Sequence, residues 1–185
     1  VDCEEETFNM DVKQIKNKIS KKTKAILIVH IYGLTVDIDS IIDLAKKNSL
    51  FVIEDAAEQL GQTYKGKPIG SFGDISTFSF FANKHITTGE GGMIVTNNKK
   101  LFERFMILKN ISFQPKKQKF IHNELGWNYR MTNMQAAFGL AQLENIKMFV
   151  KKKREIGNFY NDKLMLTGKN TNDTDYDIAR EIAGA

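Results

Sequence analysis

The first third of the chain alternates between a helical pattern and short apolar runs. Apolar residues recur at helical spacing over 11–22 and again over 37–48, where Asp37 stands at the position of an N-cap. Two short runs rich in branched apolar residues, at 24–30 and 50–55, follow these helices in turn. Such runs are typical of buried parallel strands. A strand, a helix and a second parallel strand in this order predict one βαβ unit.

The rest of the chain continues this mixture, with longer polar segments between the elements. The expected strands are 75–81 and 93–96, and the expected helices are 99–108 and 132–153, the last capped by Thr132 or Asn133. Glycine, proline and polar residues predict loops at 61–74, 82–92 and 109–124. No internal repeat and no proline- or serine-rich linker divides the chain. The pattern therefore predicts one α/β domain with a predominantly parallel sheet.

The composition is that of a folded protein that needs no disulfide or metal. Apolar residues make up 42% and charged residues 26% of the 185 residues, which is ordinary for a globular chain and excludes intrinsic disorder. No run of about 20 apolar residues is present, so no membrane span is predicted. The single cysteine, Cys3, excludes an internal disulfide and a cysteine-based zinc site. The acidic opening does not resemble a signal peptide, so we expect a cytoplasmic protein.

The net charge of +5 raises the question of a nucleic-acid partner. The basic residues are spread along the chain and nearly all are lysine, whereas phosphate and guanine are read mainly by arginine. The one basic cluster, 151–154, lies in an expected helix and is most simply a solvated helix face. The sequence therefore predicts no nucleic-acid partner.

Candidate chemistry gathers where the expected strands end, because ligands of open α/β sheets bind at the carboxyl ends of the strands. This rule selects His30, the pair Glu54 and Asp55, and the segment 79–84. Asp55 could serve a metal, a sugar hydroxyl or a protonated ring nitrogen, or it could only cap the next turn. His30 could be catalytic, or its ring could be satisfied by local hydrogen bonds.

Lys84 is the most informative of these residues. It lies beyond the aromatic strand 75–81 and just before the glycine-rich sequence TTGEGG, whose glycines permit close approach of a backbone. A lysine amine at such a place can act as a carbonyl nucleophile, although a lysine near glycines can also be simply exposed. His85 and His122 have no metal-ligand partner at useful spacing, so no metal site is predicted.

The segment GWNYRM (126–131) places an amide, aromatic rings and the guanidinium of Arg130 just before an expected helix. A helix start of this kind suits an anion. A capped turn packed by Trp127 and Tyr129 explains the same residues. The pattern alone leaves both interpretations open.

Four ordered motifs identify a family. They are VIEDAAEQLG (52–61), YKGKPIGSFGD (64–74), FSFFANKHITTGEGGMIVTN (78–97) and GWNYRMTNMQAAFGLAQLE (126–144). They resemble the pyridoxal-phosphate-dependent sugar aminotransferases of the DegT/DnrJ/EryC1/StrS family, and most closely its GDP-perosamine synthase branch. The resemblance implies the type I aminotransferase fold, with this chain as the central part of the large domain, a mostly parallel sheet flanked by helices.

The resemblance also implies roles for five residues. Lys84 matches the Schiff-base lysine that holds pyridoxal 5'-phosphate and shuttles a proton during the reaction. Asp55 matches the aspartate paired with the ring nitrogen, and Ser79 matches a serine that binds the cofactor phosphate. Glu58 stands near the position of the cofactor's ring hydroxyl. Asn128 matches an asparagine that reaches the phosphate of the neighbouring subunit's cofactor, which implies a homodimer with shared active sites.

The implied reaction is amino transfer. Some family members carry histidine in place of the lysine and act as dehydratases, whereas Lys84 is present here and is followed by His85. Glutamate is the implied donor, and a nucleotide-linked 4-keto-6-deoxy sugar is the implied acceptor. The products would enter O-antigen, capsule or glycan synthesis.

We expect the chain to hold only part of such an enzyme. It begins without methionine, and its opening, VDCEEETFNM, is typical of a strand end followed by a turn. Residues 1–150 match part of the cofactor-binding large domain. Residues 151–185 begin the connection towards a small domain, which is missing, and end in a tail unlike the family. Two other interpretations remain: a cofactor-binding relative without catalysis, and an inactive truncated fragment.

Overall fold

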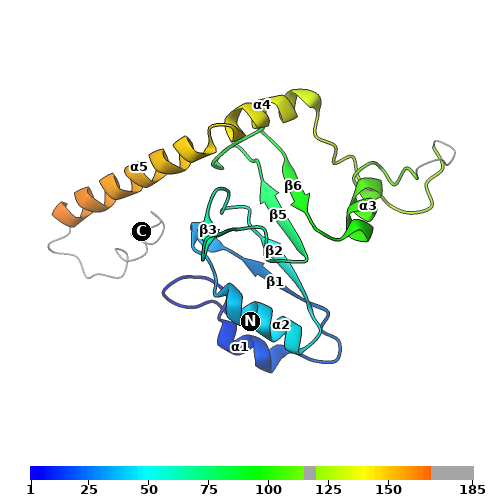
Figure 1. Cartoon of the computed structure of the whole chain (residues 1–185), viewed down its shortest axis with the longest axis horizontal. Helices are drawn as coiled ribbons and strands as arrows, with labels where there is room; N and C mark the ends of the chain where they lie inside the picture. Colours follow the sequence, from blue (N-terminus) through cyan, green and yellow to red (C-terminus); the bar gives the residue numbers. More distant parts are fainter. Residues whose placement is uncertain (115–119, 168–185) are drawn as a thin grey trace.

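The computed structural model describes residues 1–114 and 120–167 (Figure 1). Its centre is a four-stranded sheet with the order β1-β2-β5-β6. The strands are β1 (Ala25–Val29), β2 (Phe51–Asp55), β5 (Ile75–Ser79) and β6 (Gly92–Val95). The first three are parallel and β6 is antiparallel to β5, so the expected mostly parallel sheet is confirmed. Residues 168–185, which contain the tail expected at the end of 151–185, lie outside the described residues, as do positions 115–119 of the expected loop.

Most of the helices lie where the apolar spacing places them. The first four are α1 (Val12–Lys18), α2 (Ile38–Lys47), α3 (Lys99–Leu108) and α4 (Asn133–Leu143). Helix α2 begins after Asp37, whose side chain accepts a hydrogen bond from the Ser40 N–H, as expected of an N-cap. Helix α1 ends earlier than expected, because the backbone is already extended at Ile19.

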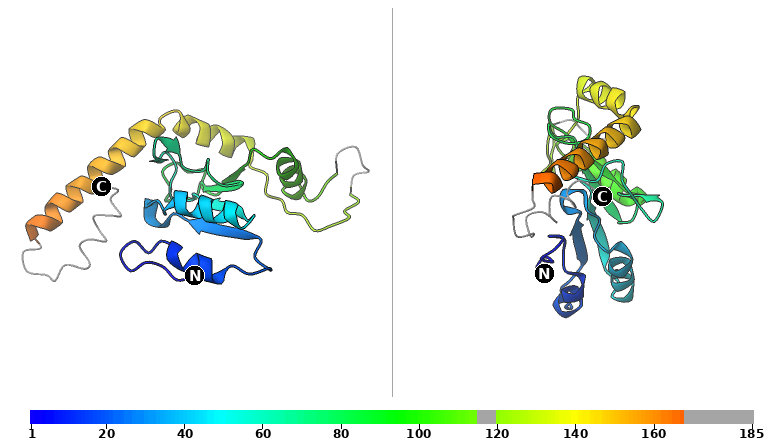
Figure 2. Two further views of the ribbon diagram at one scale, coloured as in Figure 1. Left: turned by 60° about the horizontal axis from the view of Figure 1, so that its bottom comes forward. Right: turned by 90° about the vertical axis from the view of Figure 1, so that its left-hand side faces the viewer.

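The hydrophobic core lies between α1, α2 and one face of β1 and β2 (Figures 1 and 2). It is built from buried residues of all four elements: Ile15, Ile26, Ile28, Ile38, Ile41 and Val52. The opposite face of the same strands is open, with Leu27 50% and Phe51 60% exposed. The two strands expected to be buried are therefore buried on one face only within the described residues, because the described helices cover that face alone.

A small hairpin occupies part of the segment expected to be a loop. Strands β3 (Thr63–Tyr64) and β4 (Lys67–Pro68) pair antiparallel across Lys65 and Gly66. Both turn residues have positive φ, 49° and 80°, which is the geometry of a tight two-residue hairpin turn. Strands this short carry no periodic pattern, so the sequence could not show them.

The single helix expected over 132–153 is two helices. Helix α4 ends at Leu143, and α5 (Ile146–Thr167) begins after a break at 144–145 that turns the chain in Figure 1. The Asn145 side chain donates to the Ala141 carbonyl at 3.0 Å, a local bond that competes with continued helix. Within the described residues, no helix is both long and apolar enough to cross a bilayer.

Candidate active site

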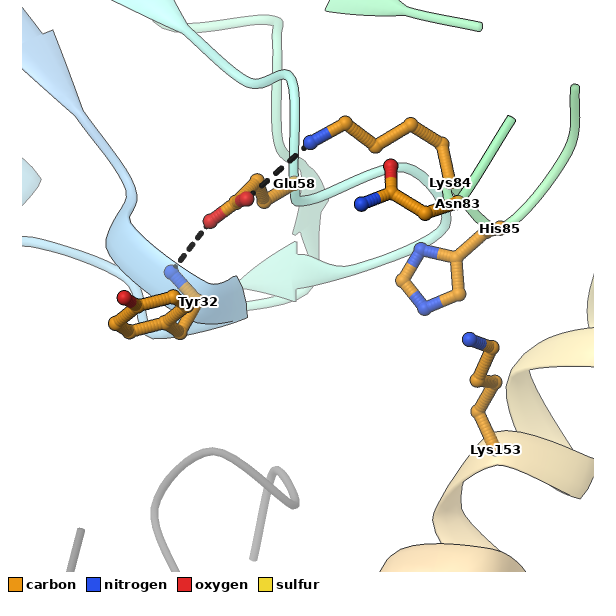
Figure 3. A pocket seen from close by; sticks show the side chains of 6 residues that line it. All are labelled: Tyr32, Glu58, Asn83, Lys84, His85 and Lys153. Atoms are coloured by element: carbon orange, nitrogen blue, oxygen red, sulfur yellow. Dashed lines mark hydrogen bonds and ion pairs between the residues drawn. The ribbon is translucent and has the colours of Figure 1, made fainter. Parts of the chain in front are cut away.

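A pocket of about 170 Å³ opens at the carboxyl end of the sheet (Figure 3). Its walls come from four parts of the chain: the turn after β1, the turn after β2, the segment after β5, and α5. The residues that line it are Tyr32, Glu58, Asn83, Lys84, His85 and Lys153. Two of the five predicted site residues, Lys84 and Glu58, therefore meet at the edge of the sheet where ligands of α/β folds bind.

The Lys84 amine is held by a short chain of hydrogen bonds (Figure 3). Its Nζ donates to Glu58 Oε1 at 3.2 Å, and the Lys84 side chain is 19% exposed. The other carboxylate oxygen, Oε2, accepts the Tyr32 backbone N–H at 2.7 Å. The interpretation of Lys84 as a simply exposed lysine is therefore wrong, because the side chain is largely shielded from water and its amine has a defined partner.

His85 lies beside Lys84, with Lys153 of α5 facing its ring (Figure 3). Burial lowers the pKa of His85, and the positive charges of Lys153 and Lys84 lower it further. The surroundings of the imidazole therefore oppose its protonation. Apart from Glu58, the charged groups lining this pocket are cationic, which favours an anionic ligand.

Replacing Lys153 by methionine is expected to raise the pKa of His85 towards its usual value. The substitution removes one of the two positive charges that oppose protonation of the ring, while keeping a side chain of similar length. The measurement is an NMR titration of the histidine ring signals. Lys147→Met, on the same helix but outside the pocket, should leave the titration unchanged. An unchanged midpoint in Lys153→Met would contradict this electrostatic account.

Asp55 ends strand β2 and is half-buried. Its Oδ1 accepts the Ala57 N–H at 3.0 Å and the Thr77 hydroxyl at 3.4 Å. Asp55 therefore caps the turn that follows β2, as one of the two interpretations expected. Among the described residues Oδ2 accepts no hydrogen bond, so the carboxylate is positioned by one oxygen and open at the other.

Ser79 and Asn128 lie outside the pocket at Lys84. Ser79 ends β5, next to the strand of Asp55, and its hydroxyl oxygen accepts the Phe81 N–H at 3.3 Å. Asn128 is exposed and bridges to Asn110 just after α3. Asp55 is likewise not among the residues that line this pocket. The structure therefore brings Lys84 and Glu58 into contact, places Asp55 and Ser79 on adjacent strand ends, and leaves Asn128 apart.

His30 and Glu54 are a fully buried structural pair rather than a catalytic one. His30 Nδ1 accepts the Val36 N–H at 3.3 Å, so the proton of a neutral ring stands on Nε2, which faces Glu54 Oε1 at 3.3 Å. Glu54 also accepts the backbone N–H groups of Gly70, Phe72 and Gly73 and the Ser76 hydroxyl. Burial raises the pKa of Glu54, but the bonds from His30 and the three N–H groups outweigh it and lower the pKa to about 2.

The segment 126–131 is a turn whose aromatic residues are exposed, Trp127 by 42% and Tyr129 by 74%. Its backbone bonds to the end of α3, with the Trp127 N–H donating to Leu108 at 2.8 Å and the Tyr129 N–H to Lys109 at 3.0 Å. The two rings stack at 6.2 Å. Thr132 then starts α4 with a capping box, so the first turn of the helix is capped by its own side chains. The structure favours the capped turn over an anion site, but the expected packing by Trp127 and Tyr129 is wrong, because both residues are exposed.

The sequence profile of the DegT/DnrJ/EryC1/StrS aminotransferase family matches residues 1–178. The chain belongs to this family. The GDP-perosamine synthase of Escherichia coli O157:H7 is 54% identical over 160 residues, which cover 86% of this chain and 44% of that enzyme. The chain thus spans less than half the length of this relative.

Solved structures of sugar-modifying enzymes share the fold. Helicobacter pylori PseC, an aminotransferase of pseudoaminic acid biosynthesis, has a TM-score of 0.80 and 33% identity over 92% of this chain and 45% of its own. The GDP-4-keto-6-deoxy-D-mannose-3-dehydratase of E. coli, solved with bound hydrated pyridoxal phosphate, has a TM-score of 0.79 and 30% identity over 89% of this chain and 46% of its own. The expected aminotransferase fold is therefore confirmed.

Proposed function

We propose that this chain is part of an enzyme that transfers the amino group of glutamate, through pyridoxal phosphate, to a nucleotide-linked 4-keto-6-deoxy sugar. The observation that carries the proposal is the shielded Lys84 amine, held by Glu58 in a pocket at the carboxyl end of the sheet. The 54% identity with a GDP-perosamine synthase supports a perosamine-type product for O-antigen, capsule or glycan synthesis. We keep the expectation of a cytoplasmic location.

The chemical groups of the candidate site residues match those that pyridoxal phosphate needs. Lys84 supplies an amine for a carbonyl carbon, and Asp55 supplies a carboxylate whose Oδ2 is open to a protonated ring nitrogen. The Ser79 hydroxyl accepts a backbone N–H, which leaves its proton for a phosphate oxygen. Glu58 would lie near the ring hydroxyl. Asn128, which is exposed, would contact the cofactor phosphate of a second subunit.

The chain's own groups would act mainly by holding and moving protons. Bound pyridoxal phosphate supplies an electron sink for the carbon that loses its proton. Lys84 Nζ would carry that proton, and Glu58 Oε1 would hold Nζ in the pocket while the amine is not bonded to the cofactor. The cationic pocket wall formed by Lys153 would attract the anionic groups that glutamate and a nucleotide sugar both carry.

We also propose a homodimer with shared active sites. Asp55 and Ser79 stand at strand ends of the sheet, whereas Asn128 is exposed and bridges to Asn110 after α3, which supports a role for Asn128 in the partner's site. The adjacent α4 presents apolar side chains to solvent, with Met134 85% and Phe138 62% exposed, which suits burial against another chain. Residues 1–150 would be part of the large domain, and 151–185 the start of the connection to a small one.

Adding pyridoxal phosphate and then glutamate to the protein distinguishes this function from its alternatives. The purified protein is mixed with pyridoxal phosphate and then with glutamate, and the visible absorption of the bound cofactor is followed. We expect glutamate to bleach the band, and GDP-4-keto-6-deoxymannose to restore it with formation of an amino sugar. A band that glutamate does not bleach would indicate binding without catalysis. A 3-deoxy sugar product would indicate a dehydratase, and no band would indicate an inactive fragment.

A further inference from the structure

The turn that supplies Tyr32 to the pocket has a strained backbone. Tyr32 lies in the short 3-10 turn η1 (Ile31–Gly33) with φ 51° and ψ 25°, the left-handed region. A residue with a side chain pays about 1–2 kcal/mol to adopt this conformation. In this conformation the Tyr32 N–H reaches Glu58 Oε2 at 2.7 Å. Contacts elsewhere must therefore hold the turn in place.

Asn9, in the opening segment of the chain, forms side-chain hydrogen bonds to this turn on both sides. Its side chain is buried, with the residue 2% exposed. Asn9 Oδ1 accepts the Ile31 N–H at 3.0 Å, and Asn9 Nδ2 donates to the Leu34 carbonyl at 3.0 Å. These two partners stand immediately before and after the strained Tyr32 and its neighbour Gly33. One amide thus clamps both ends of the turn.

The opening segment is itself held by hydrogen bonds, and these bonds fix the position of Asn9. The Asn9 N–H donates to Thr7 Oγ1 at 3.2 Å, and the Thr7 hydroxyl donates to Glu4 Oε2 at 2.9 Å. The Glu4 N–H in turn donates to the Asn9 carbonyl at 2.8 Å. A continuous set of contacts therefore runs from this segment, through the turn and Glu58, to the Lys84 amine.

We propose that Asn9 is a positioning residue for Lys84: it clamps residues 31–34 so that the Tyr32 N–H binds Glu58, and Glu58 then holds the Lys84 amine. The functional meaning of this inference rests on the proposed role of Lys84. The contacts themselves belong to this chain alone. The acidic opening segment, far from Lys84 in the sequence, thereby becomes part of the support of the site.

The test reads Lys84 directly, without cofactor. Lysines are methylated with limiting formaldehyde and dimethylamine–borane, and the rate at Lys84 is measured by peptide mass spectrometry, together with hydrogen exchange of the Tyr32 amide. In Asn9→Ala we expect both rates to rise about tenfold, the loss equivalent to one hydrogen bond to a charged group. Glu58→Gln, which loosens the same amine directly, sets the scale for Lys84.

Two further variants make the result decisive. Asn48→Ala also removes one side chain–backbone bond, from Asn48 Nδ2 to the Leu44 carbonyl, but at the end of α2, so both rates should stay unchanged. Thr7→Val keeps the side-chain volume and removes the hydroxyl beneath Asn9, and a smaller rise of both rates is expected. If Asn9→Ala does not fold, Thr7→Val decides by the same two rates.

Unchanged rates at Lys84 and Tyr32 in both Asn9→Ala and Thr7→Val would overturn the inference, even if both variants melt at lower temperature, because Asn9 would then serve only stability. The outcome is separable from the proposed function. A protein that binds no pyridoxal phosphate, yet releases Lys84 in Asn9→Ala, would contradict the function and support the positioning role.

Discussion

Replacing Lys84 by alanine is expected to lower amino transfer at least about 10³-fold, because in the proposed function this one residue would supply both the nucleophile and the proton carrier. The structure leaves no evident substitute among the pocket residues. The other basic residues that line the pocket are His85, whose pKa is lowered, and Lys153, which comes from a different element, α5. The measurement is the steady-state rate with glutamate and GDP-4-keto-6-deoxymannose, with melting temperature as the check on folding.

Two further variants distinguish the amine from its charge. Lys84→Arg keeps the positive charge but not a usable nucleophile, so it should be as inactive as Lys84→Ala. Lys147→Ala, on α5 and outside the pocket, should retain the parent rate. Activity of Lys84→Ala within tenfold of the parent would show that another residue holds the cofactor.

Replacing Glu54 by glutamine is expected to cost about 3 kcal/mol or more of unfolding free energy, the loss typical of a broken buried charge network. The carboxylate accepts bonds from Gly70, Phe72 and Gly73, and it faces His30. A glutamine of the same size has only one acceptor oxygen, and its NH₂ group would face the N–H groups that the carboxylate now accepts. Several buried donors would therefore lose their partner. Chemical denaturation at neutral pH measures the difference.

The same carboxylate predicts a loss of stability in acid. Its pKa is about 2 in the folded protein against 4.5 for an ordinary glutamate, so ionised Glu54 stabilises the fold above about pH 4.5. About 3 kcal/mol of this should disappear as the pH falls from 4.5 to about 2, at roughly 1.4 kcal/mol per pKa unit. Glu54→Gln should flatten that part of the curve.

The matched control for Glu54 is Glu103→Gln. Glu103 lies on the exposed face of α3, where it is 4.0 Å from Lys99 Nζ, and such a surface pair contributes well under 1 kcal/mol. Its substitution should change the unfolding free energy by less than about 0.5 kcal/mol. Equal losses in the two variants would contradict the account of Glu54 as the buried anchor of residues 70–73.

The sequence predicts those parts of the fold that have a strong local pattern. Helix α3 has the predicted bounds, and α2 begins after its Asp37 cap, because apolar spacing and caps act within a few residues. The break at Asn145 and the hairpin around Lys65 and Gly66 depend on single side-chain or backbone conformations, so the apolar pattern does not contain them. The open face at Leu27 depends on what packs there, which composition alone does not show.

In the site, too, the sequence predicts what has a local pattern and misses what depends on contacts between distant residues. The position of Lys84 after a strand and before glycines makes it a candidate functional amine, and its contact with Glu58 follows from the parallel order of β2 and β5. The sequence could not decide whether His30 is catalytic or structural. Its burial and the hydrogen bond from the Val36 N–H show that the ring nitrogen is already bonded within the protein. The clamp by Asn9 joins residues 22 and more positions apart, and no spacing in the sequence points to it.

The most direct test of the central claim is to find where pyridoxal phosphate attaches. The protein is incubated with the cofactor, reduced with borohydride to make the link permanent, digested and analysed by mass spectrometry. We predict one pyridoxyl group, on the peptide that contains Lys84, and its absence in Lys84→Arg. A stable link on another lysine, or no link at all, would contradict the assignment of Lys84 as the cofactor-binding residue of this chain.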